Sequence, residues 1–567
     1  MKKNMKHIRG IQIAIPVLIL MWATIGVCFS TTYYVDISVT DTHMASATPD
    51  FTTYNHTTFA TTGGRDRVFK TIADINSFSA LAAGDSVLFR KGQTWREQLT
   101  IPASGSSGNP ITFGAYGSGA QPLISGEGPT ANRAYCIKVN VRTYITINDL
   151  HTERAIGAYA ENIYILNSSY VNVQNCESEY SAHSGIKILD SPYCVIRNCV
   201  THHNYNTGIF AKQSNNILIT NCISHHNDYK GIDIEAEQDN EILNATVEVC
   251  TSHDNKREGI DTDNADGVTV RRCNVYLNGS LSPDFPGISI GNGTQDATIS
   301  YCIIHHNFNE GITIEQSGEN TGTKIYNDVF YGNGANNIYI KSNSTTIRNC
   351  VSMNAGNSLF TVPSGLGIMY TNSDYNIFYD DTDFKMVWNG TIYNNLIAFC
   401  TASSQEANSK ENDPHFIGAS NDDFRVQYNS VVIDAGTDVG LIEDYIGNPV
   451  PFSTRPDMGA YEWQGTLVDG NLIPLITKLN QNYPNPFNPT TTIEFSIQND
   501  SHIELTVRNI KGQKIKSLLN DQITAGEHSI AWDGKDAFGK KVSSGVYLYK
   551  LSVNGKIEAV RKCLLLK

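Results

Sequence analysis

Short runs of alternating apolar and polar residues recur through the middle of the chain, and each run opens with a Gly-Ile pair. The six runs read GIKI, GIFA, GIDI, GIDT, GISI and GITI. Their glycines are Gly185, Gly208, Gly231, Gly259, Gly287 and Gly311. Successive side chains of a strand point to opposite faces, so we expect the first and third positions after each glycine inside and the second and fourth outside. The pattern predicts one such strand per repeat, with the glycine at the turn that leads into it.

Two further residue types repeat in step with these strands. Cysteines follow one another at intervals of 23, 23, 28, 23 and 29 residues, at Cys176, Cys199, Cys222, Cys250, Cys273 and Cys302. From the second of them onward an asparagine comes five residues later, at Asn204, Asn227, Asn255, Asn278 and Asn307. A period of this length without a helical pattern predicts a β-solenoid whose coils pair in parallel. We expect the thiols to be buried and reduced, because parallel side chains have poor disulfide geometry, and the amides to bond from coil to coil.

The segments on either side of the repeats predict how the solenoid ends. Residues 70–83 predict a short amphipathic helix that covers the N-terminal end of the core. The segments DPHFIGASNDDFRV, VVIDAG and RPDMGAYEW follow the coils, and we assign them to packing. From about residue 479, roughly seven short alternating strands with turn signals between them predict a β-sandwich. The predicted protein is all-β, with a parallel β-helix over residues 31–465, a linker over 466–478 and an immunoglobulin-like sandwich over 479–567.

Two resemblances to known families follow from these motifs. The cysteine, asparagine and isoleucine columns resemble the right-handed parallel β-helix family of pectate lyases and related proteins, over roughly residues 70–400. The motifs NYPNPFNP, WDGKD and SSGVYLYKL and the basic-apolar end of the chain resemble, in order, the C-terminal sorting domain of the type IX (Por) secretion system. The first implies an architecture that many activities share. The second implies export across an outer membrane by the type IX machinery, followed by release or surface attachment.

The N-terminus and the charge agree with an exported protein. Residues 1–30 combine a basic start, an apolar run and a final small residue, which predicts a secretory signal peptide. No other apolar run of the sequence is long enough to span a bilayer. The formal net charge of -14 argues against nucleic acid or an anionic membrane as a partner, since both need a basic surface. We expect a monomer that is secreted or displayed on the cell surface.

Histidines, often in pairs, repeat with the same period as the cysteines. They are His202, His203, His225, His226, His253, His305 and His306. The ligands of a metal ion must converge on one point, whereas a column that runs along a solenoid diverges. We therefore expect these histidines to stack as part of the structure.

The outward positions of the repeated strands bring acidic residues together. Four carboxylates are expected on one exposed face of two adjacent coils: Asp233, Glu235, Asp261 and Asp263. Strands in such a sheet are about 4.8 Å apart, so these like charges need compensation. A hard cation such as Ca²⁺, which takes several oxygen ligands, is the compensation we expect. In the alternative interpretation, Lys212 and Glu235 form a surface ion pair and the other acids are solvated.

The resemblance to pectate lyases implies a reaction for this face. In lyases of this fold a bound Ca²⁺ neutralises a uronate carboxylate, and a lysine or arginine removes the acidified proton from the neighbouring carbon. The resemblance implies Lys212, Lys230 or Arg257 for that role. Phe210 and Tyr229 are expected to stack on sugar rings. The sequence thus favours a Ca²⁺-assisted lyase that acts on an acidic polysaccharide.

The sequence also departs from the family patterns, and other functions stay open. In REGIDTD, Arg257 and Ile260 replace residues of the pectate lyase pattern, and no lysine occurs from residue 257 to 323, where that family places its base. The polygalacturonase pattern is less complete, since Gly-His-Gly and Arg-Ile-Lys are absent. Hydrolysis by Asp233 with Asp261 or Asp263 is one alternative. A non-catalytic adhesin or glycan-binding protein is the other.

Overall fold

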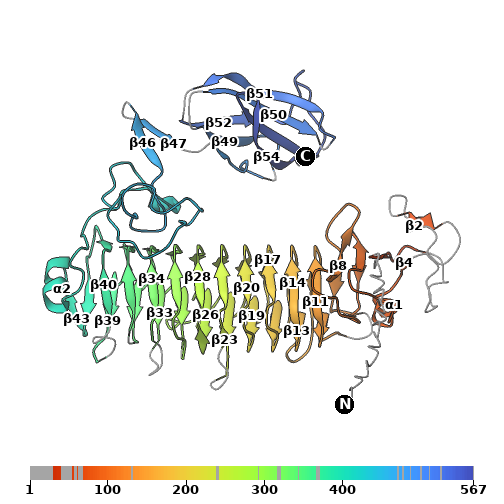
Figure 1. Ribbon diagram of the computed structural model, residues 1–567, viewed down its shortest axis with the longest axis horizontal. Helices are drawn as coiled ribbons and strands as arrows, with labels where there is room; N and C mark the ends of the chain where they lie inside the picture. The colour runs from red at the N-terminus through yellow and green to blue at the C-terminus, as the bar shows by residue number, and fades with distance from the viewer. Residues whose placement is uncertain are drawn as a thin grey trace, which may run out of the picture.

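The computed structural model describes residues 30–39, 54–55, 60–61, 68–128, 132–237, 242–291, 293–315, 321–342, 344–365, 371–468, 471–474, 478–485, 487–497, 501–509, 511–523 and 526–565. Residues 1–29 of the predicted signal peptide lie outside these residues. Within them, no helix has the length and apolar character needed to cross a membrane. The fold is all-β, as predicted: a solenoid is followed by antiparallel sheets (Figure 1).

Three long sheets form the sides of the solenoid, and the winding chain adds strands to each of them in turn (Figure 1). In the described part of the chain, the 14-stranded sheet contains, in spatial order, β4 (Val68–Phe69), β1 (Thr32–Val35), β5 (Ser86–Arg90), β8 (Ile111–Tyr116), β11 (Thr143–Asn148), β14 (Ser169–Gln174), β17 (Val195–Arg197), β20 (Leu218–Thr220), β24 (Thr246–Glu248), β28 (Thr269–Arg271), β31 (Thr298–Ser300), β34 (Lys324–Tyr326), β37 (Thr346–Arg348) and β40 (Asn372–Asp374).

The other two sheets are built in the same way. Among the described residues, the 13-stranded sheet contains β7 (Leu99–Thr100), β10 (Tyr135–Asn140), β13 (Glu161–Leu166), β16 (Ile186–Leu189), β19 (Ile209–Lys212), β22 (Ile232–Glu235), β26 (Ile260–Asp263), β30 (Ile288–Ile290), β33 (Ile312–Ile314), β36 (Ile338–Ile340), β39 (Phe360–Val362), β42 (Met386–Trp388) and β43 (Thr391–Tyr393). The 12-stranded sheet contains β6 (Thr94–Trp95), β9 (Leu123–Ser125), β12 (His151–Glu153), β15 (Glu177–Glu179), β18 (Val200–His202), β21 (Ile223–His225), β25 (Thr251–His253), β29 (Asn274–Tyr276), β32 (Ile303–His305), β35 (Val329–Tyr331), β38 (Val351–Met353) and β41 (Ile377–Tyr379).

The Gly-Ile runs lie in the 13-stranded sheet, and their inward and outward positions are those predicted. Ile232 and Ile234 of β22 are fully buried in the main core, while Asp233 between them points outward. The preceding glycines are needed for space: a Cβ on Gly185 would lie 2.8 Å from the side-chain nitrogen of Asn204. The asparagine column packs directly on the glycine column, so a larger residue would displace it.

The cysteine and asparagine columns also behave as predicted. The six cysteines of the column are free and buried. Cys222, for example, donates from Sγ to the Ile196 carbonyl oxygen at 3.6 Å. In the asparagine ladder each Nδ2 donates to the Oδ1 of the next coil, at 2.9 Å from Asn227 to Asn255 and from Asn255 to Asn278. These amides satisfy one another inside the turn, where water does not reach them.

The repeated histidines stack along the outer face of the 12-stranded sheet. The ring centroids of His202 and His225 are 4.9 Å apart, and the same distance separates His225 from His253. Tyr276 continues the stack at 4.7 Å from His253. The spacing equals the distance between neighbouring parallel strands. The expectation of a structural stack is confirmed for this column.

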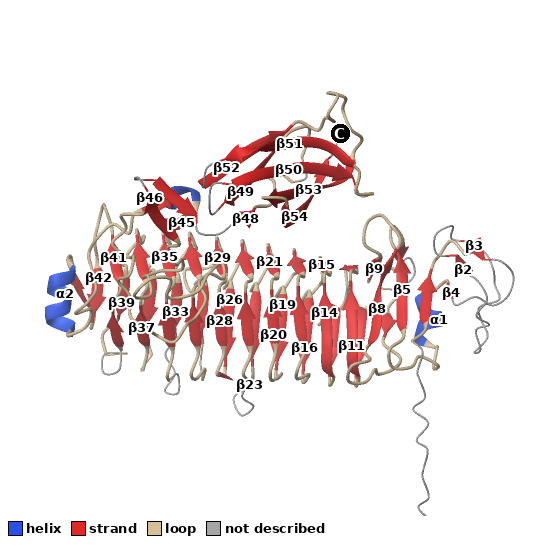
Figure 2. Ribbon diagram, turned by 45° about the horizontal axis from the view of Figure 1, so that its top comes forward, coloured by secondary structure: helices blue, strands red, loops and turns tan. Residues whose placement is uncertain are grey.

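Short helices lie at both ends of the solenoid (Figure 2). At the N-terminal end, α1 (Ile72–Asn76) buries Ile72 and Ile75, and a capping box joins Thr71 to Asp74. The predicted helix of residues 70–83 was wrong in extent, because Ser77, Phe78 and Ser79 are weak helix formers, and the chain continues as turns after Asn76. At the other end, α2 (Leu396–Ser403) buries Phe399 against aromatic residues of the last coils.

The segments after the coils pack on the outside of the solenoid, as assigned. Phe416, Phe424 and Met458 form a second apolar cluster with Val329 and Val351 of the 12-stranded sheet. In this region β44 (Phe416–Gly418) and β45 (Asp423–Val426) flank the 3-10 helix η2 (Ala419–Asn421). Two small sheets elsewhere pair β2 (Tyr54–Asn55) with β3 (Ala60–Thr61) and β23 (Ile242–Leu243) with β27 (Ala265–Asp266).

The C-terminal region forms the predicted sandwich. One sheet contains β48 (Lys478–Leu479), β49 (Thr491–Ile497) and β52 (Gly526–Trp532). The other contains β51 (Lys514–Ile523), β50 (Ser501–Asn509), β53 (Gly545–Val553) and β54 (Lys556–Leu565). Its core is separate from that of the solenoid and includes Trp532 and Tyr549. The predicted linker contains a hairpin of β46 (Gly465–Val468) and β47 (Asn471–Pro474).

Candidate active site

Outward side chains of the 13-stranded sheet follow one another in register from coil to coil. We call this row the outer column. From β10 to β36 it consists of Lys138, Tyr164, Lys187, Phe210, Asp233, Asp261, Ser289, Thr313 and Tyr339. Lysine and aromatic side chains alternate up to β19, and carboxylates follow on β22 and β26. The chemistry of the column therefore changes abruptly between two adjacent coils.

A lysine joins the two carboxylates of the outer column. Lys230 lies in the turn before β22, and its Nζ is 3.2 Å from Oδ1 of Asp233 on the same coil. The same Nζ forms an ion pair with Oδ2 of Asp261 on the next coil. Glu258 occupies the position of Lys230 one coil later, directly before the glycine. We call Lys230, Asp233, Glu258 and Asp261 the central cluster.

The central cluster is buried, contrary to the expectation of an exposed acidic face. Asp233 and Asp261 are only 2% and 3% exposed, and Lys230 and Glu258 are 5% and 6% exposed. Outward side chains about 4.8 Å apart cover one another, and the Lys230 side chain reaches across both aspartates. The predicted positions on the outer face were right, but the predicted exposure was wrong for these two aspartates.

The central cluster contains more acidic than basic groups. Its three carboxyl groups face the cations of Lys230 and of Arg257, whose Nη2 is 3.2 Å from Oε1 of Glu258. Burial raises the pKa of Asp233 to about 8, although Lys230 opposes this effect. Burial also raises the pKa of Glu258. Buried charge is costly unless it is paired, and this cost favours a protonated carboxyl group in the cluster near neutral pH.

Lys230 itself stays protonated. Burial alone lowers the pKa of its ammonium group, but the charges of Asp233 and Asp261 outweigh burial and hold that pKa well above its ordinary value. A general base must release its proton near the working pH. The surroundings of Lys230 therefore favour a role in charge compensation.

The second outward position of the strands forms a separate ion pair. Nζ of Lys212 is 2.9 Å from Oε1 of Glu235 and 3.7 Å from Oε1 of Glu237. Burial lowers the pKa of Lys212, but its bonds to these glutamates outweigh that effect and raise the pKa overall. The contact is the ion pair of the alternative interpretation. Asp263 is half-buried beside Glu235 in the register of β22 and β26.

Arg257 lies between two aromatic rings. Its guanidinium carbon is 4.1 Å from the ring centre of Tyr229 and 4.0 Å from that of Phe285. Such contacts hold a guanidinium group through the ring faces. Phe285 comes from the insert YLNGSLSPDFPG between β29 and β30, and the sequence analysis did not predict its role. The unusual length of that insert was the sequence feature that could have indicated a contact of this kind. The predicted sugar platform Tyr229 is covered by Arg257 on one face.

The first part of the outer column combines lysines with aromatic rings. Nζ of Lys138 is 4.7 Å from the ring centre of Tyr135, which stacks on Tyr164 with 5.1 Å between centres. Nζ of Lys187 is 5.2 Å from the ring centre of Phe210. We call these five residues the aromatic-lysine section. Nζ of Lys187 is also 3.2 Å from Oε1 of the buried Glu161, and Phe210 is itself buried. Only Phe210 of this section was predicted as a binding residue.

The predicted calcium ligands are the right kind of donor, but three of the four, Asp233, Glu235 and Asp261, form ion pairs with lysines. Lys230 contacts Asp233 and Asp261, and Lys212 contacts Glu235. In this arrangement ammonium groups supply the compensating charge that the sequence analysis assigned to Ca²⁺. A calcium ion at these carboxylates would have to compete with Lys230.

Comparisons with known proteins agree with this architecture. The family described as right-handed β-helix region matches residues 135–290 and 243–351. The family described as FlgD Ig-like domain matches residues 485–556. The chain contains a right-handed β-helix region and an Ig-like domain. Among curated proteins no match was found.

Several solved structures resemble the chain. Pectate lyase Pel9A has 15% identity over 77% of this chain and 97% of its own, with a TM-score of 0.45. The GH136 lacto-N-biosidase from Eubacterium ramulus has 14% identity over 68% of this chain and 67% of its own, with a TM-score of 0.40. The periplasmic alginate epimerase AlgG, as a mutant, has 14% identity over 54% and 78%, with a TM-score of 0.37.

Proposed function

We propose that this protein is an exported enzyme that binds an acidic polysaccharide along the outer column and cleaves it at the central cluster. The observation that carries the proposal is the register of the outer column, in which Lys187 and Phe210 lead directly to Asp233 and Asp261. Lysines pair with the carboxylates of an acidic sugar chain, and aromatic residues contact its rings. A bound chain that follows the column would place a glycosidic bond at the carboxyl groups.

The proton held in the central cluster favours hydrolysis. Glycosidic cleavage needs a carboxyl group that is still protonated near neutral pH and can donate to the leaving oxygen. Asp233, with its pKa raised to about 8 by burial, supports that role. Asp261, in an ion pair with the Lys230 ammonium on the neighbouring coil, is the candidate for the second carboxyl group.

A Ca²⁺-assisted elimination is the second candidate reaction. Its support is the register of β22 and β26, which sets Asp233 beside Asp261 and Glu235 beside Asp263. Carboxylate oxygens of this kind are ligands that Ca²⁺ prefers. Bound there, the ion would neutralise a uronate carboxylate. Lys212, Lys230 and Arg257 are the candidates for removing the proton, and each of them now has an acidic partner.

One assay separates the three functions. The purified protein is incubated with a panel of uronate polymers, with Ca²⁺ or with a chelator, while new reducing ends and the absorbance of unsaturated uronides are followed. Hydrolysis gives reducing ends without the absorbance, and elimination gives both. Asp233→Asn should reduce either activity by about 10²-fold or more. Glu315→Gln is the matched control. Glu315 lies three strands along the same sheet in an ion pair with Lys341, and this variant should keep the activity. Binding without cleavage by the unchanged protein would identify a glycan-binding protein.

We also propose that residues 479–567 direct export through the type IX system. The separate core of the sandwich supports a unit that folds by itself. Deleting it should leave the solenoid folded, with unchanged thermal unfolding, but should keep the protein from the medium and the cell surface. Normal export of the truncated protein would refute this assignment.

A further inference from the structure

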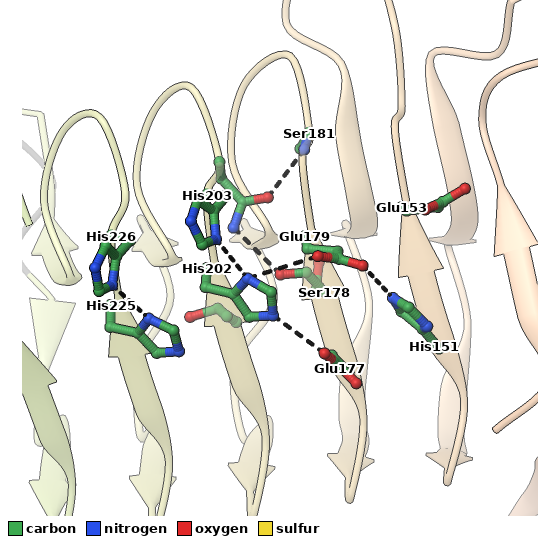
Figure 3. A network of polar contacts seen from close by, with 12 residues as sticks. His151, Glu153, Glu177, Ser178, Glu179, Ser181, His202, His203, His225 and His226 are labelled. Carbon is green, nitrogen blue, oxygen red and sulfur yellow. Dashed lines mark hydrogen bonds and ion pairs between the residues drawn. The ribbon is translucent and has the colours of Figure 1, made fainter. Parts of the chain in front are cut away.

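Two histidines and two glutamates converge at the N-terminal end of the histidine stack. Glu177 and Glu179 project from β15, His151 from the strand on one side and His202 from the strand on the other. Figure 3 shows both imidazole rings turned toward the two carboxylates. The stack itself diverges along the solenoid, but these four side chains meet over a single strand. They lie on the 12-stranded sheet, away from the outer column.

The distances within this group suit one small cation. Nε2 of His151 is 2.9 Å from Oε1 of Glu179, and Nε2 of His202 is 3.1 Å from Oε1 of Glu177. Nδ1 of His202 is 3.6 Å from Oε2 of Glu179. Donor atoms of His151, Glu177 and Glu179 all lie within 4.8 Å of one another. A tetrahedral shell with bonds of about 2.0–2.2 Å sets neighbouring donors about 3.3–3.6 Å apart. His151, Glu177 and Glu179 can thus approach one ion, and His202 would join them by turning one of its two ring nitrogens, which now face different glutamates, toward it.

We propose that His151, Glu177, Glu179 and His202 bind a divalent transition-metal ion such as Zn²⁺. Imidazole nitrogens together with carboxylate oxygens select such a metal over Ca²⁺ or Mg²⁺, which prefer oxygen alone. Four protein ligands close the shell, which is typical of a structural site. The metal would join three consecutive coils and stabilise the solenoid. The proposal is independent of the proposed enzymatic function.

The surroundings of the group favour binding. The side chains of His151, Glu179 and His202 are only 21%, 15% and 13% exposed, so they are held by their neighbours while a metal ion can still reach them. Nδ1 of His202 is 2.8 Å from Nδ1 of His203. A hydrogen bond at the second ring nitrogen orients a ligating imidazole.

Two other groups near the stack provide an internal comparison. They are His226 with His253 and Asp254, and His305 with His306 and Asp422. Each has a single carboxylate, whereas the proposed site has two. Fewer charged donors and fewer ligands give a weaker site, so the proposed site should fill first.

Metal competition tests the proposal on the full chain. The protein is freed of metal, and Zn²⁺ is titrated against a chromophoric chelator. We expect one site that is tighter than any other, and a loss of about tenfold or more in its affinity in His151→Gln and in Glu179→Gln. His225→Gln removes a ring of the same stack but no ligand, and should stay within about threefold of the unchanged protein. Unchanged affinity in both His151→Gln and Glu179→Gln would overturn the proposal.

Thermal unfolding gives a second readout that does not depend on the chelator. Zn²⁺ should raise the melting temperature of the unchanged protein and of His225→Gln, because a ligand that binds the folded state stabilises it. The same addition should have no such effect on His151→Gln, whose fold is checked by circular dichroism. With Co²⁺ in place of Zn²⁺, the visible absorption of a tetrahedral site should appear and be lost in Glu179→Gln. A shift of equal size in His151→Gln and the unchanged protein would contradict the proposed site.

Discussion

Lys230 and Asp261 form a buried ion pair across two neighbouring coils, although 31 residues separate them in the sequence. The parallel register sets Asp261 beside Asp233, and Lys230 reaches both. Removing one partner of a buried pair leaves an uncompensated charge away from water, which is far more costly than the loss of a surface pair. This relationship makes Lys230 central to the stability of the outer face.

Lys230→Met should destabilise the solenoid by about 3–5 kcal/mol at pH 7. The substitution keeps most of the side-chain volume but leaves Asp233 and Asp261 without their ammonium partner. Lys212→Met is the matched control, since its ion pair is half-exposed, and should cost about 1 kcal/mol or less. Denaturant unfolding of the three proteins measures the difference. Equal costs for the two variants would show that the central cluster does not depend on Lys230.

The contribution of Asp233 to the stability of the fold should fall as the pH rises from about 4 to about 8. Its pKa is raised from 3.8 to about 8 by burial, so the unfolded chain gives up this proton at a lower pH than the folded chain does. Asp233→Asn removes this titration and should flatten the profile by about 1–3 kcal/mol. Melting temperatures at pH 5 and pH 8.5 measure the effect. The comparison of the two proteins separates Asp233 from the histidines, which titrate in the same range.

Calcium should bind more tightly to Lys230→Met than to the unchanged protein. The substitution removes the ammonium group that competes for the oxygens of Asp233 and Asp261. We expect a larger rise of the melting temperature with millimolar Ca²⁺, and no rise in a double variant that also carries Asp261→Asn. If Ca²⁺ has the same effect on all three proteins, it does not bind between these aspartates.

Asn255→Ala should destabilise the fold by about 3 kcal/mol or more, because it leaves several buried donors and acceptors unpaired. The Asn255 side chain accepts from the backbone and side chain of Asn227 and donates to Asn278. Asn221→Gly is the control: its amide donates to Asn198 in an exposed ladder on another turn, glycine suits its φ of 53°, and loss of the amide should cost about 1 kcal/mol or less. Hydrogen exchange of the Asn227 amide should accelerate in the first variant alone. Similar costs in both would mean that burial does not decide the strength of the ladders.

Cys222→Ser should cost about 1–3 kcal/mol, because a buried hydroxyl replaces a thiol that behaves as a small apolar group. Cys222 is 1% exposed, and its thiol makes long contacts to the carbonyl oxygens of Ile196 and Thr220. Denaturant unfolding measures the cost, and peptide mass spectrometry without reductant checks the thiols. A disulfide between Cys199 and Cys222 would contradict the free column.

Regular features of the solenoid were predictable from local sequence. The Gly-Ile runs, the cysteines and the asparagines each recur once per coil, so a single repeat indicates which side chains point inward and which residues stack. The same repetition made the histidine stack predictable, since it continues from His202 to His253 with one ring per coil. The sandwich was predictable because its strands alternate and its turns carry their own signals.

The side-chain contacts in the two candidate sites depend on how neighbouring coils pack against each other. Alternation places Asp233 and Asp261 on the outer face, but it does not show that Lys230, from the preceding turn, reaches between them and buries them. Inserts are equally hard to predict: the position of Phe285 over Arg257 depends on how a long loop folds back. For these reasons the expected exposure of the acidic face was wrong.

By itself, the sequence determined the periodic part of this protein: an all-β solenoid, its inward columns, its stacked ladders and a separate C-terminal sandwich. Those features repeat with the chain, and each copy has the same local cause. Only the tertiary structure decided which side chains meet across coils, such as Lys230 with Asp261 and His151 with Glu179. Such pairs depend on the exact register of neighbouring coils and on the rotamers of long side chains, and local sequence does not determine either of them.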